Sequence, residues 1–280
     1  MTQFIAGRRW LKKLLPAFLP PRVVFTTPAG THISLLTKDL RGPSFHVLFG
    51  GGEGFLNYEK LERDEIVKLL PERGVFLDIG ANVGLFTFSI CERMPRVRVH
   101  AFEPHPELFK CLEETVASNR LSNEITLHAV ALGKKAGHFR LFLDESDSGG
   151  HSLKQEVLQN NKLESSSHRV RVIPLDDLAE VQSLDRIDVI KIDVQGAELE
   201  CVSGAARTFE KFRPAILIEC ENEKLLRSEN VLTTLLSVDP DYTVHRIGHH
   251  EKIRSGQIAS IAREELNVGR LQSNYFCVRS

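Results

Sequence analysis

The amino-acid sequence predicts an α/β fold built on a doubly wound, mostly parallel sheet. From Gly74 onward, short apolar runs alternate with stretches of helical periodicity, a pattern typical of parallel strands covered by helices on both faces. An apolar content of 42% and a charged content of 26% over 280 residues are those of a globular protein with a sizeable core. The first buried run ends in a bend of small residues that opens a helix, as expected for the first crossover of such a sheet.

Residues 1–57 are expected to form a basic arm followed by an accessory hairpin. Two strand-like stretches at 23–26 and 32–36 flank a Pro-Ala-Gly turn, and 45–49 is a further short strand candidate. The glycine-rich run at 50–54 lacks the Gly-Lys-Ser/Thr ending of a phosphate-binding loop, so we interpret it as a flexible connector.

Residues 58–280 are expected to form the main domain, with an insertion at about 137–173. Strand-like stretches at 139–143 and 169–173 bracket a polar loop at 144–168, which is a place where a substrate could be covered. Elsewhere the pattern predicts strands at 75–79, 97–103, 125–130, 187–193 and 215–219, helices at 58–70, 85–92, 107–119 and 197–210, and a closing antiparallel pair at 242–247 and 274–279 with no clean helix between its strands.

Charge and cysteine content exclude several classes of protein. The chain has 36 Lys and Arg against 37 Asp and Glu, which gives no broad positive field for nucleic acid, so we expect no nucleic-acid partner. The five cysteines are widely spaced and include no Cys-x-x-Cys pair, which favours reduced, buried thiols over a redox or metal site.

The charge is unevenly distributed at the N-terminus. Residues 1–30 contain five Lys or Arg and no Asp or Glu, and apolar side chains recur at roughly helical spacing within 1–20. This stretch is suited either to weak contact with an anionic membrane surface or to packing on its own domain, and Pro16 limits the helix it can form. No run reaches about 18 apolar residues. We therefore expect a cytoplasmic protein, or one that is peripheral at the membrane, and the oligomeric state stays open.

The most informative motif is the bend after the first predicted buried strand. Asp78, Gly80, Asn82 and Gly84 alternate there, and glycines permit close approach of a ligand to the backbone. Glu103 ends the next predicted strand, 19 residues beyond Gly84, where a carboxylate can accept hydrogen bonds from both ribose hydroxyls of an adenosine ligand. The order of these residues does not match Gly-x-Gly-x-x-Gly, which makes a nicotinamide or flavin enzyme the lesser interpretation.

This bend resembles the first motif of class I S-adenosylmethionine-dependent methyltransferases. More narrowly, the chain resembles the FkbM methyltransferase family from about Tyr58 to Glu221. One departure is Gln195, which stands where the family usually has Glu. The resemblance rests on five ordered segments: Leu77-Asp-Ile-Gly-Ala-Asn-Val-Gly84, Ala101-Phe-Glu-Pro104, Ala129-Val-Ala-Leu-Gly133, Leu175-Asp-Asp-Leu178 and Ile190-Lys-Ile-Asp193-Val-Gln-Gly-Ala-Glu198.

The resemblance implies a seven-stranded class I methyltransferase sheet, S-adenosyl-L-methionine as cofactor and a methyltransferase activity. The expected reaction is O-methylation of a hydroxyl on a saccharide, glycolipid or natural-product acceptor. Glu103 would hold the ribose, and Phe102 and Leu132 would help form the adenine wall. The residues expected at the cofactor site are Asp78, Gly80, Ala81, Asn82, Gly84, Phe102, Glu103, Pro104 and Leu132.

Hydroxyl methylation is assisted by a base that takes the acceptor proton, so carboxylates and histidines near the cleft are candidates. Asp193 is the first choice because it ends the fourth predicted strand of the parallel sheet, although it could instead pair with Lys191 or hold the cofactor ammonium. Glu198, which opens the next helix, and His151 in the insertion are the other catalytic candidates. Asp193 and Glu219 end neighbouring strands and could hold Mg²⁺, but the expectation is that no metal is bound.

Two smaller features and two rival functions stay open. Tyr58 and Glu59 resemble a family pair that closes over the cofactor, and a plain helix start explains them equally well. A non-catalytic module that binds an adenosyl ligand is one alternative function, and a nicotinamide-dependent oxidoreductase is a weaker one. The first would bind cofactor without turnover, and the second would bind NAD.

Overall fold

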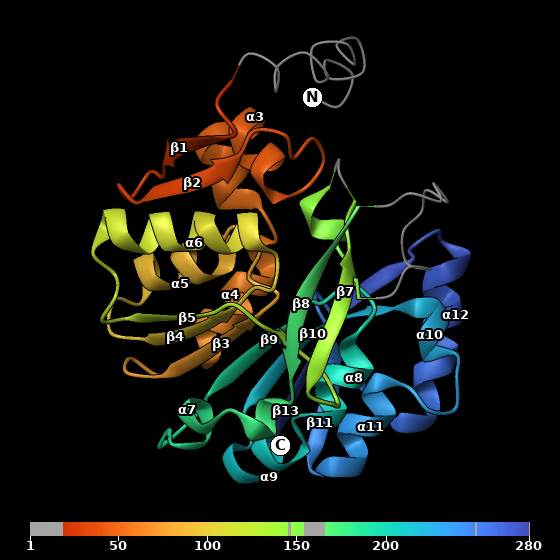
Figure 1. Ribbon diagram of the computed structural model, residues 1–280. Coiled ribbons are helices and arrows are strands. Elements are labelled where there is room, and N and C mark those ends of the chain that lie inside the picture. The colour runs from red at the N-terminus through yellow and green to blue at the C-terminus, as the bar shows by residue number, and fades with distance from the viewer. Residues whose placement is uncertain (1–18, 145–146, 154–165, 250, 280) are drawn as a thin grey trace.

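The computed structural model describes residues 19–144, 147–153, 166–249 and 251–279, and it is built around one large mixed sheet (Figure 1). The sheet has eight strands in the order β12-β11-β13-β10-β9-β3-β4-β5, in place of the expected seven. The additional strand is β12, a two-residue edge strand. The strands are β3 (Val75–Ile79), β4 (Arg98–Phe102), β5 (Ile125–His128), β9 (Val189–Ile192), β10 (Ala215–Glu221), β11 (Tyr242–Arg246), β12 (Lys252–Ile253) and β13 (Gln272–Arg279).

The doubly wound prediction is confirmed by how the central strand divides the core. Side chains along β3 alternate between the two faces of the sheet. Leu77 packs with Val202 and Leu232 on one face, whereas Phe76 packs with residues such as Phe88 on the other. The first face is covered by α8 (Glu198–Ser203), α9 (Ala206–Phe212), α11 (Val231–Val238) and α12 (Ile258–Asn267), and the second by α4 (Lys60–Leu69), α5 (Leu85–Arg93) and α6 (Pro106–Asn119).

The predicted N-terminal hairpin is confirmed as β1 (Arg22–Thr26) and β2 (His32–Leu36), which pair antiparallel and lie against α6 (Figure 1). The expected strand at 45–49 and the connector at 50–54 are wrong, because both lie within the helix α3 (Pro43–Asn57). The helix kinks at Gly51, which has a φ of 56°. The basic stretch expected at the membrane falls on residues 1–18, which lie outside the described residues.

The two strands of the insertion pair with a short preceding strand in a separate three-stranded sheet, in the order β6-β8-β7. Its strands are β6 (Ala131–Leu132), β7 (Gly137–Phe142) and β8 (Ser167–Ile173). Between β7 and β8, the chain forms the short 3-10 turn η1 (Ser148–Gly150), while residues 145–146 and 154–165 of the predicted polar loop lie outside the described residues. A second 3-10 turn, η3 (Leu175–Asp177), and the short helix α7 (Ala179–Gln182) lead back to the main sheet.

Two expectations for the C-terminal half are wrong. The helix expected at 197–210 is split into α8 and α9 around Gly204, because the Asp176 carboxylate accepts hydrogen bonds from the backbone N–H groups of Arg207 and Thr208 and so starts a new helix. The closing pair β11 and β13 is antiparallel as predicted, but α12 lies between its strands in sequence, along with the 3-10 turn η4 (Ser255–Gln257). The short helix α10 (Asn222–Leu225) follows β10.

Over the part of the chain that the structure describes, no helix has the length and apolar character needed to cross a lipid bilayer.

Candidate functional site

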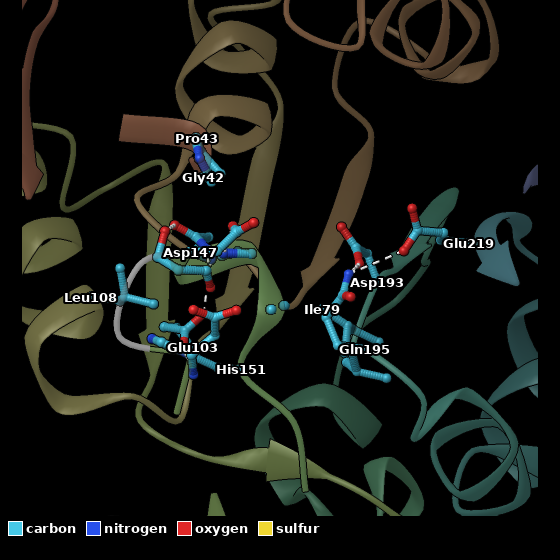
Figure 2. A pocket seen from close by; sticks show the side chains of 18 of the residues that line it. Gly42, Pro43, Ile79, Glu103, Leu108, Asp147, His151, Asp193, Gln195 and Glu219 are labelled. Atoms are coloured by element: carbon cyan, nitrogen blue, oxygen red, sulfur yellow. Dashed lines mark hydrogen bonds between the residues drawn. The ribbon is translucent and has the colours of Figure 1, made fainter. Parts of the chain in front are cut away.

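A cavity of about 670 Å³ opens at the carboxyl ends of the parallel strands (Figure 2). Ile79, Phe102, Asp193 and Glu219, from β3, β4, β9 and β10 or the residues just after them, all line it. Ligands of open α/β sheets bind at this edge. The N-terminal segment adds Arg41, Gly42, Pro43 and His46, and the insertion adds Asp144, Asp147, Ser148, Gly149, Gly150, His151 and Leu153.

The loop after β3 is held in a strained conformation at one side of the cavity. Gly80 has a φ of 80°, and a β-carbon there would lie 1.9 Å from the backbone oxygen of Asp193. The N–H groups of Gly80 and Ala81 donate to the Phe102 carbonyl at 3.1 and 3.0 Å. Asn82 has a φ of 53°, and its N–H donates to Glu103 at 2.8 Å. The first two strand ends therefore converge, as the motif spacing predicts.

Glu103 is the buried carboxylate at this convergence, with only 6% of its surface exposed. Its two oxygens accept hydrogen bonds from the backbone N–H groups of Asn82 and His105, each at 2.8 Å. Burial raises the pKa of Glu103 to about 7, although those two hydrogen bonds favour the ionised form. The carboxylate lines the cavity and keeps lone pairs available for a ligand.

An apolar wall stands beside Glu103. Phe102 is buried and stacks on the His128 ring, with centroids 4.4 Å apart and an interplanar angle of 9°. Phe102, Ala81, Pro104 and Leu132 all line the cavity, where the sequence placed them.

Asp78 and Gly84 do not line the cavity. Asp78 is fully buried and accepts hydrogen bonds from the backbone N–H and the hydroxyl of Thr87, at 3.2 and 2.7 Å. A β-carbon on Gly84 would lie 2.3 Å from the ring of Phe88, so this glycine serves the packing of α5. Both residues contact the first turns of α5 instead of the cavity, where direct contact with a cofactor was expected.

His151 lines the cavity but lies beside Glu103 and Leu108, away from Asp193 and Glu219 (Figure 2). Its ring packs against His105 with centroids 4.7 Å apart, and its Nδ1 accepts the Asp144 N–H at 3.2 Å. Burial lowers the pKa of His151 to about 4, which leaves the ring neutral at physiological pH. His151 therefore lies on the Glu103 side of the cavity, and its catalytic role stays a prediction.

Asp39, a residue that sequence reasoning missed, joins the N-terminal segment to the insertion on the Glu103 side of the cavity. Its buried carboxylate accepts hydrogen bonds from the N–H groups of Gly42 and Ser44, both at 2.9 Å. It also accepts from the N–H and the hydroxyl of Ser148, at 3.0 and 2.8 Å. The Ser148 carbonyl in turn accepts from the Asn82 side chain at 2.9 Å. We call Asp39, Ser148 and Asn82 the strap.

The opposite end of the cavity is acidic. The side-chain amide of Gln195 donates to Asp193 Oδ1 at 2.7 Å and to Glu219 Oε2 at 3.0 Å. Glu59, in the left-handed region at the start of α4, also lines this end and is hydrogen-bonded to Tyr58. Burial, followed by the Asp193 charge, raises the pKa values of both Glu59 and Glu219.

Lys191 is the buried cation that balances the negative charge at the acidic end of the cavity. Its Nζ lies 3.3 Å from Asp193 Oδ2 and 3.6 Å from Asp78 Oδ1, and it donates to the Gly80 carbonyl at 3.2 Å. Burial alone would lower the pKa of Lys191, but the carboxylates of Asp193, Asp78 and Glu59 raise it above its ordinary value. Lys191 therefore remains a cation and ties the loop after β3 to the loop after β9.

Glu198, the second catalytic candidate, does not line this cavity, and its catalytic role stays a prediction. It has 5% of its surface exposed and accepts the Gly196 N–H at 2.8 Å, closing the turn before α8. Burial raises its pKa to about 7. It faces a separate cavity of about 60 Å³ that also contacts Lys224.

The arrangement at the acidic end does not form a recognisable metal site. The Gln195 amide occupies the position between Asp193 and Glu219, the pair considered for Mg²⁺. Within the described ranges, no group of three or more His, Cys, Asp or Glu side chains is arranged to hold an ion.

The strand order and the cavity at the carboxyl ends define a class I methyltransferase architecture. The family model described as the methyltransferase FkbM domain matches residues 78–240, and the chain belongs to this family. The resemblance seen in the sequence is thereby confirmed.

Individual relatives show how far the similarity extends. AMB antimetabolite synthetase AmbE of Pseudomonas aeruginosa is 32% identical over 52% of this chain and 8% of its own length. The 2-O-methyltransferase NoeI of Sinorhizobium fredii is 27% identical over 64% of this chain and 76% of its own length. The chain spans less than two thirds of the length of four of the curated relatives that it matches. A crystal structure of methyltransferase FkbM from Methylobacillus flagellatus superposes with a TM-score of 0.49 and 19% identity, over 75% of this chain and 45% of that chain.

Proposed function

We propose that the chain is an S-adenosylmethionine-dependent O-methyltransferase that acts on a hydroxyl of a saccharide, glycolipid or natural-product acceptor. One observation carries the proposal: the loop after β3 is hydrogen-bonded to Glu103 at one side of a cavity whose other side is a carboxylate cluster. The first side suits an adenosyl ligand, and the second suits a group that must lose a proton. Family membership supports methyl transfer in general.

The residues of the Glu103 side fit the cofactor. Glu103 supplies an acceptor for a ribose diol, and Phe102 and Leu132 supply a flat apolar wall for adenine. Gly80 lets the loop after β3 pack directly against the backbone of Asp193, where a side chain could not fit. The Asp193 carboxylate lines the cavity, and its negative charge would attract the methionine ammonium although both of its oxygens already have protein partners. When bound, the cofactor supplies an activated methyl group on a sulfonium centre.

The protein must then orient the acceptor hydroxyl and provide a group that takes its proton. Asp193, Glu219 and Glu59 lie at the same end of the cavity and can hold acceptor hydroxyls by hydrogen bonds. The strap joins the N-terminal segment, the insertion and the loop after β3 on the Glu103 side of the cavity. An oxygen acceptor is supported by NoeI, whose name describes a 2-O-methyltransferase. We propose a small molecule or glycan as partner, in keeping with the balanced charge of the chain.

The test is transfer of label from methyl-labelled S-adenosylmethionine to a panel of free sugars, sugar nucleotides, glycolipids and natural-product alcohols. We expect an ether-linked methyl group on one class of hydroxyl acceptor, and no transfer by a variant that lacks Glu103. Label found on an amine or a carboxylate instead would contradict the O-methyl assignment. Tight cofactor binding without transfer to any acceptor would favour the non-catalytic module, and binding of NAD in its place would favour the oxidoreductase.

A further inference from the structure

The two carboxylates at the acidic end of the cavity differ in how many partners they have. Both oxygens of Asp193 are engaged, Oδ1 by the Gln195 amide at 2.7 Å and Oδ2 by the Lys191 ammonium at 3.3 Å. A proton placed on Oδ2 would break this ion pair and leave Lys191 buried with Asp78 as its remaining carboxylate neighbour within 4 Å. Removing one partner of a buried ion pair is costly. Asp193 is therefore poorly placed to accept a proton during a reaction.

Glu219 differs from Asp193 because one of its carboxylate oxygens accepts no hydrogen bond from the described residues. Its Oε2 accepts the Gln195 amide at 3.0 Å, and among the described residues none donates a hydrogen bond to Oε1. The side chain lines the cavity, and the dashed lines of Figure 2 show Gln195 bridging it to Asp193. Gln195 itself is held at its carbonyl end by the Gln272 amide at 3.4 Å. The bridge thus fixes the direction of Glu219 while leaving one of its oxygens open to the cavity.

The charges that face Glu219 favour proton uptake. Burial contributes most to its raised pKa, and the negative charges of Asp193 on the β9 loop, Glu59 at the start of α4 and Glu198 at the start of α8 add to it. Lys191 on β9 acts in the opposite direction, but it lies against Asp193. A carboxylate in such surroundings is a stronger base than one exposed to water.

We infer that Glu219 is the catalytic base that removes the proton of the acceptor hydroxyl, and that Asp193 is a positioning residue held by Lys191 and Gln195. The inference rests on the proposed function. The proton passes to Glu219 Oε1, and the acceptor oxygen uses its electron pair to form the bond to the transferred methyl carbon. The electron pair of the broken carbon–sulfur bond stays on sulfur. Glu219 then returns its proton to water.

The experiment compares Glu219→Gln, Glu219→Asp and Asp193→Asn with wild type, using the hydroxyl acceptor found by the labelled-transfer panel. Turnover is measured against pH, and calorimetry measures binding of S-adenosylhomocysteine by each variant. Glu210→Gln is the control, because Glu210 is an exposed carboxylate on α9 outside the cavity.

For Glu219→Gln we expect kcat to fall by roughly 10²- to 10⁴-fold, with little change in acceptor KM or in S-adenosylhomocysteine affinity. The acidic limb of the kcat–pH profile should disappear. Glu219→Asp should keep that limb at reduced kcat, because it retains a carboxylate. Asp193→Asn should weaken ligand binding but keep the limb, and the control should match wild type.

Wild-type kcat and an intact acidic limb in Glu219→Gln would overturn the assignment to Glu219, as would loss of the limb in Asp193→Asn alone. A wild-type protein that binds no S-adenosylhomocysteine, or that methylates no hydroxyl, would instead overturn the proposed function and this inference with it. The two failures are therefore distinguishable.

Discussion

The backbone oxygen of Asp193 lies 1.9 Å from the position that a β-carbon on Gly80 would occupy. The loop after β3 and the loop after β9 thus touch backbone to backbone, and Lys191 adds a hydrogen bond to the Gly80 carbonyl and an ion pair to the Asp193 side chain. This contact joins the loop on the Glu103 side of the cavity to the loop that carries Asp193.

Gly80→Ala should therefore destabilise the protein by about 2–4 kcal/mol, the sum of an overpacking cost and the cost of a positive φ. Gly30→Ala is the matched control, because Gly30 has a φ of 97° and a β-carbon on it would have no atom within 4 Å, so it should cost only about 1 kcal/mol. Urea unfolding of both variants measures the difference. Equal losses would show that the Gly80–Asp193 contact has no special cost.

Glu103→Ala should weaken binding of S-adenosylhomocysteine by roughly 1–3 kcal/mol, because a charge-assisted hydrogen-bond acceptor is lost. The variant also leaves the N–H groups of Asn82 and His105 without their acceptor, so binding is measured by calorimetry at a temperature where circular dichroism shows a native fold. Unchanged affinity would remove Glu103 from the ligand site.

Ligand binding should also release protons near neutral pH. The pKa of Glu103 is raised to about 7, and a ribose diol donates to the ionised carboxylate, so binding favours loss of the proton. Affinity should rise as the pH increases through 7 and level off above it. Calorimetry in two buffers of different ionisation enthalpy measures the released protons, and pH-independent affinity would contradict the assignment.

Glu198→Gln should stabilise the protein at pH 8. The pKa of Glu198 is raised from its ordinary value of 4.5 to about 7 in the folded protein. The protonated carboxyl therefore favours folding, and this contribution to stability is lost as the pH rises from about 4.5 through 7. The amide can still accept the Gly196 N–H, so the gain should approach at most about 3 kcal/mol at pH 8 and vanish near pH 4. Urea unfolding at both pH values tests this, and a loss at pH 8 would contradict it. Turnover should survive, since Glu198 lies outside the cavity.

Opening the strap should expose the insertion. Ser148→Ala removes the hydroxyl that donates to Asp39 at 2.8 Å but keeps the backbone N–H donor, so we expect a loss of about 1 kcal/mol in stability. Proteolysis within the insertion should become faster, and S-adenosylhomocysteine should bind more weakly. Wild-type proteolysis and affinity would show that the strap does not position the cavity wall.

Local patterns predicted the central part of the fold well. The bounds of β3 agree with the prediction, and the convergence of its loop with Glu103 follows from the register of parallel strands. The helix at Pro43–Asn57 was missed because its glycine-rich run argues against a helix, whereas its start is stabilised by Asp39, a contact that depends on tertiary structure.

Side-chain direction was harder to predict than position in the chain. Asp78 and Glu198 stand in motif positions beside the cavity, yet their carboxylates accept hydrogen bonds from Thr87 and from the Gly196 N–H. Gly84 stands in the same motif, but it is a glycine because the Phe88 ring fills the space of a β-carbon. Lys191 was visible in the motif, but its three partners come from two strands and their loops, so its role depends on how β3 and β9 pair.

A crystal structure of the protein with S-adenosylhomocysteine tests the central claim most directly. We expect the ribose hydroxyls on Glu103, the adenine against Phe102 and Leu132, and the sulfur directed toward the end of the cavity that holds Asp193 and Glu219. A ligand bound elsewhere, or bound in this cavity without contact to Glu103, would contradict the account.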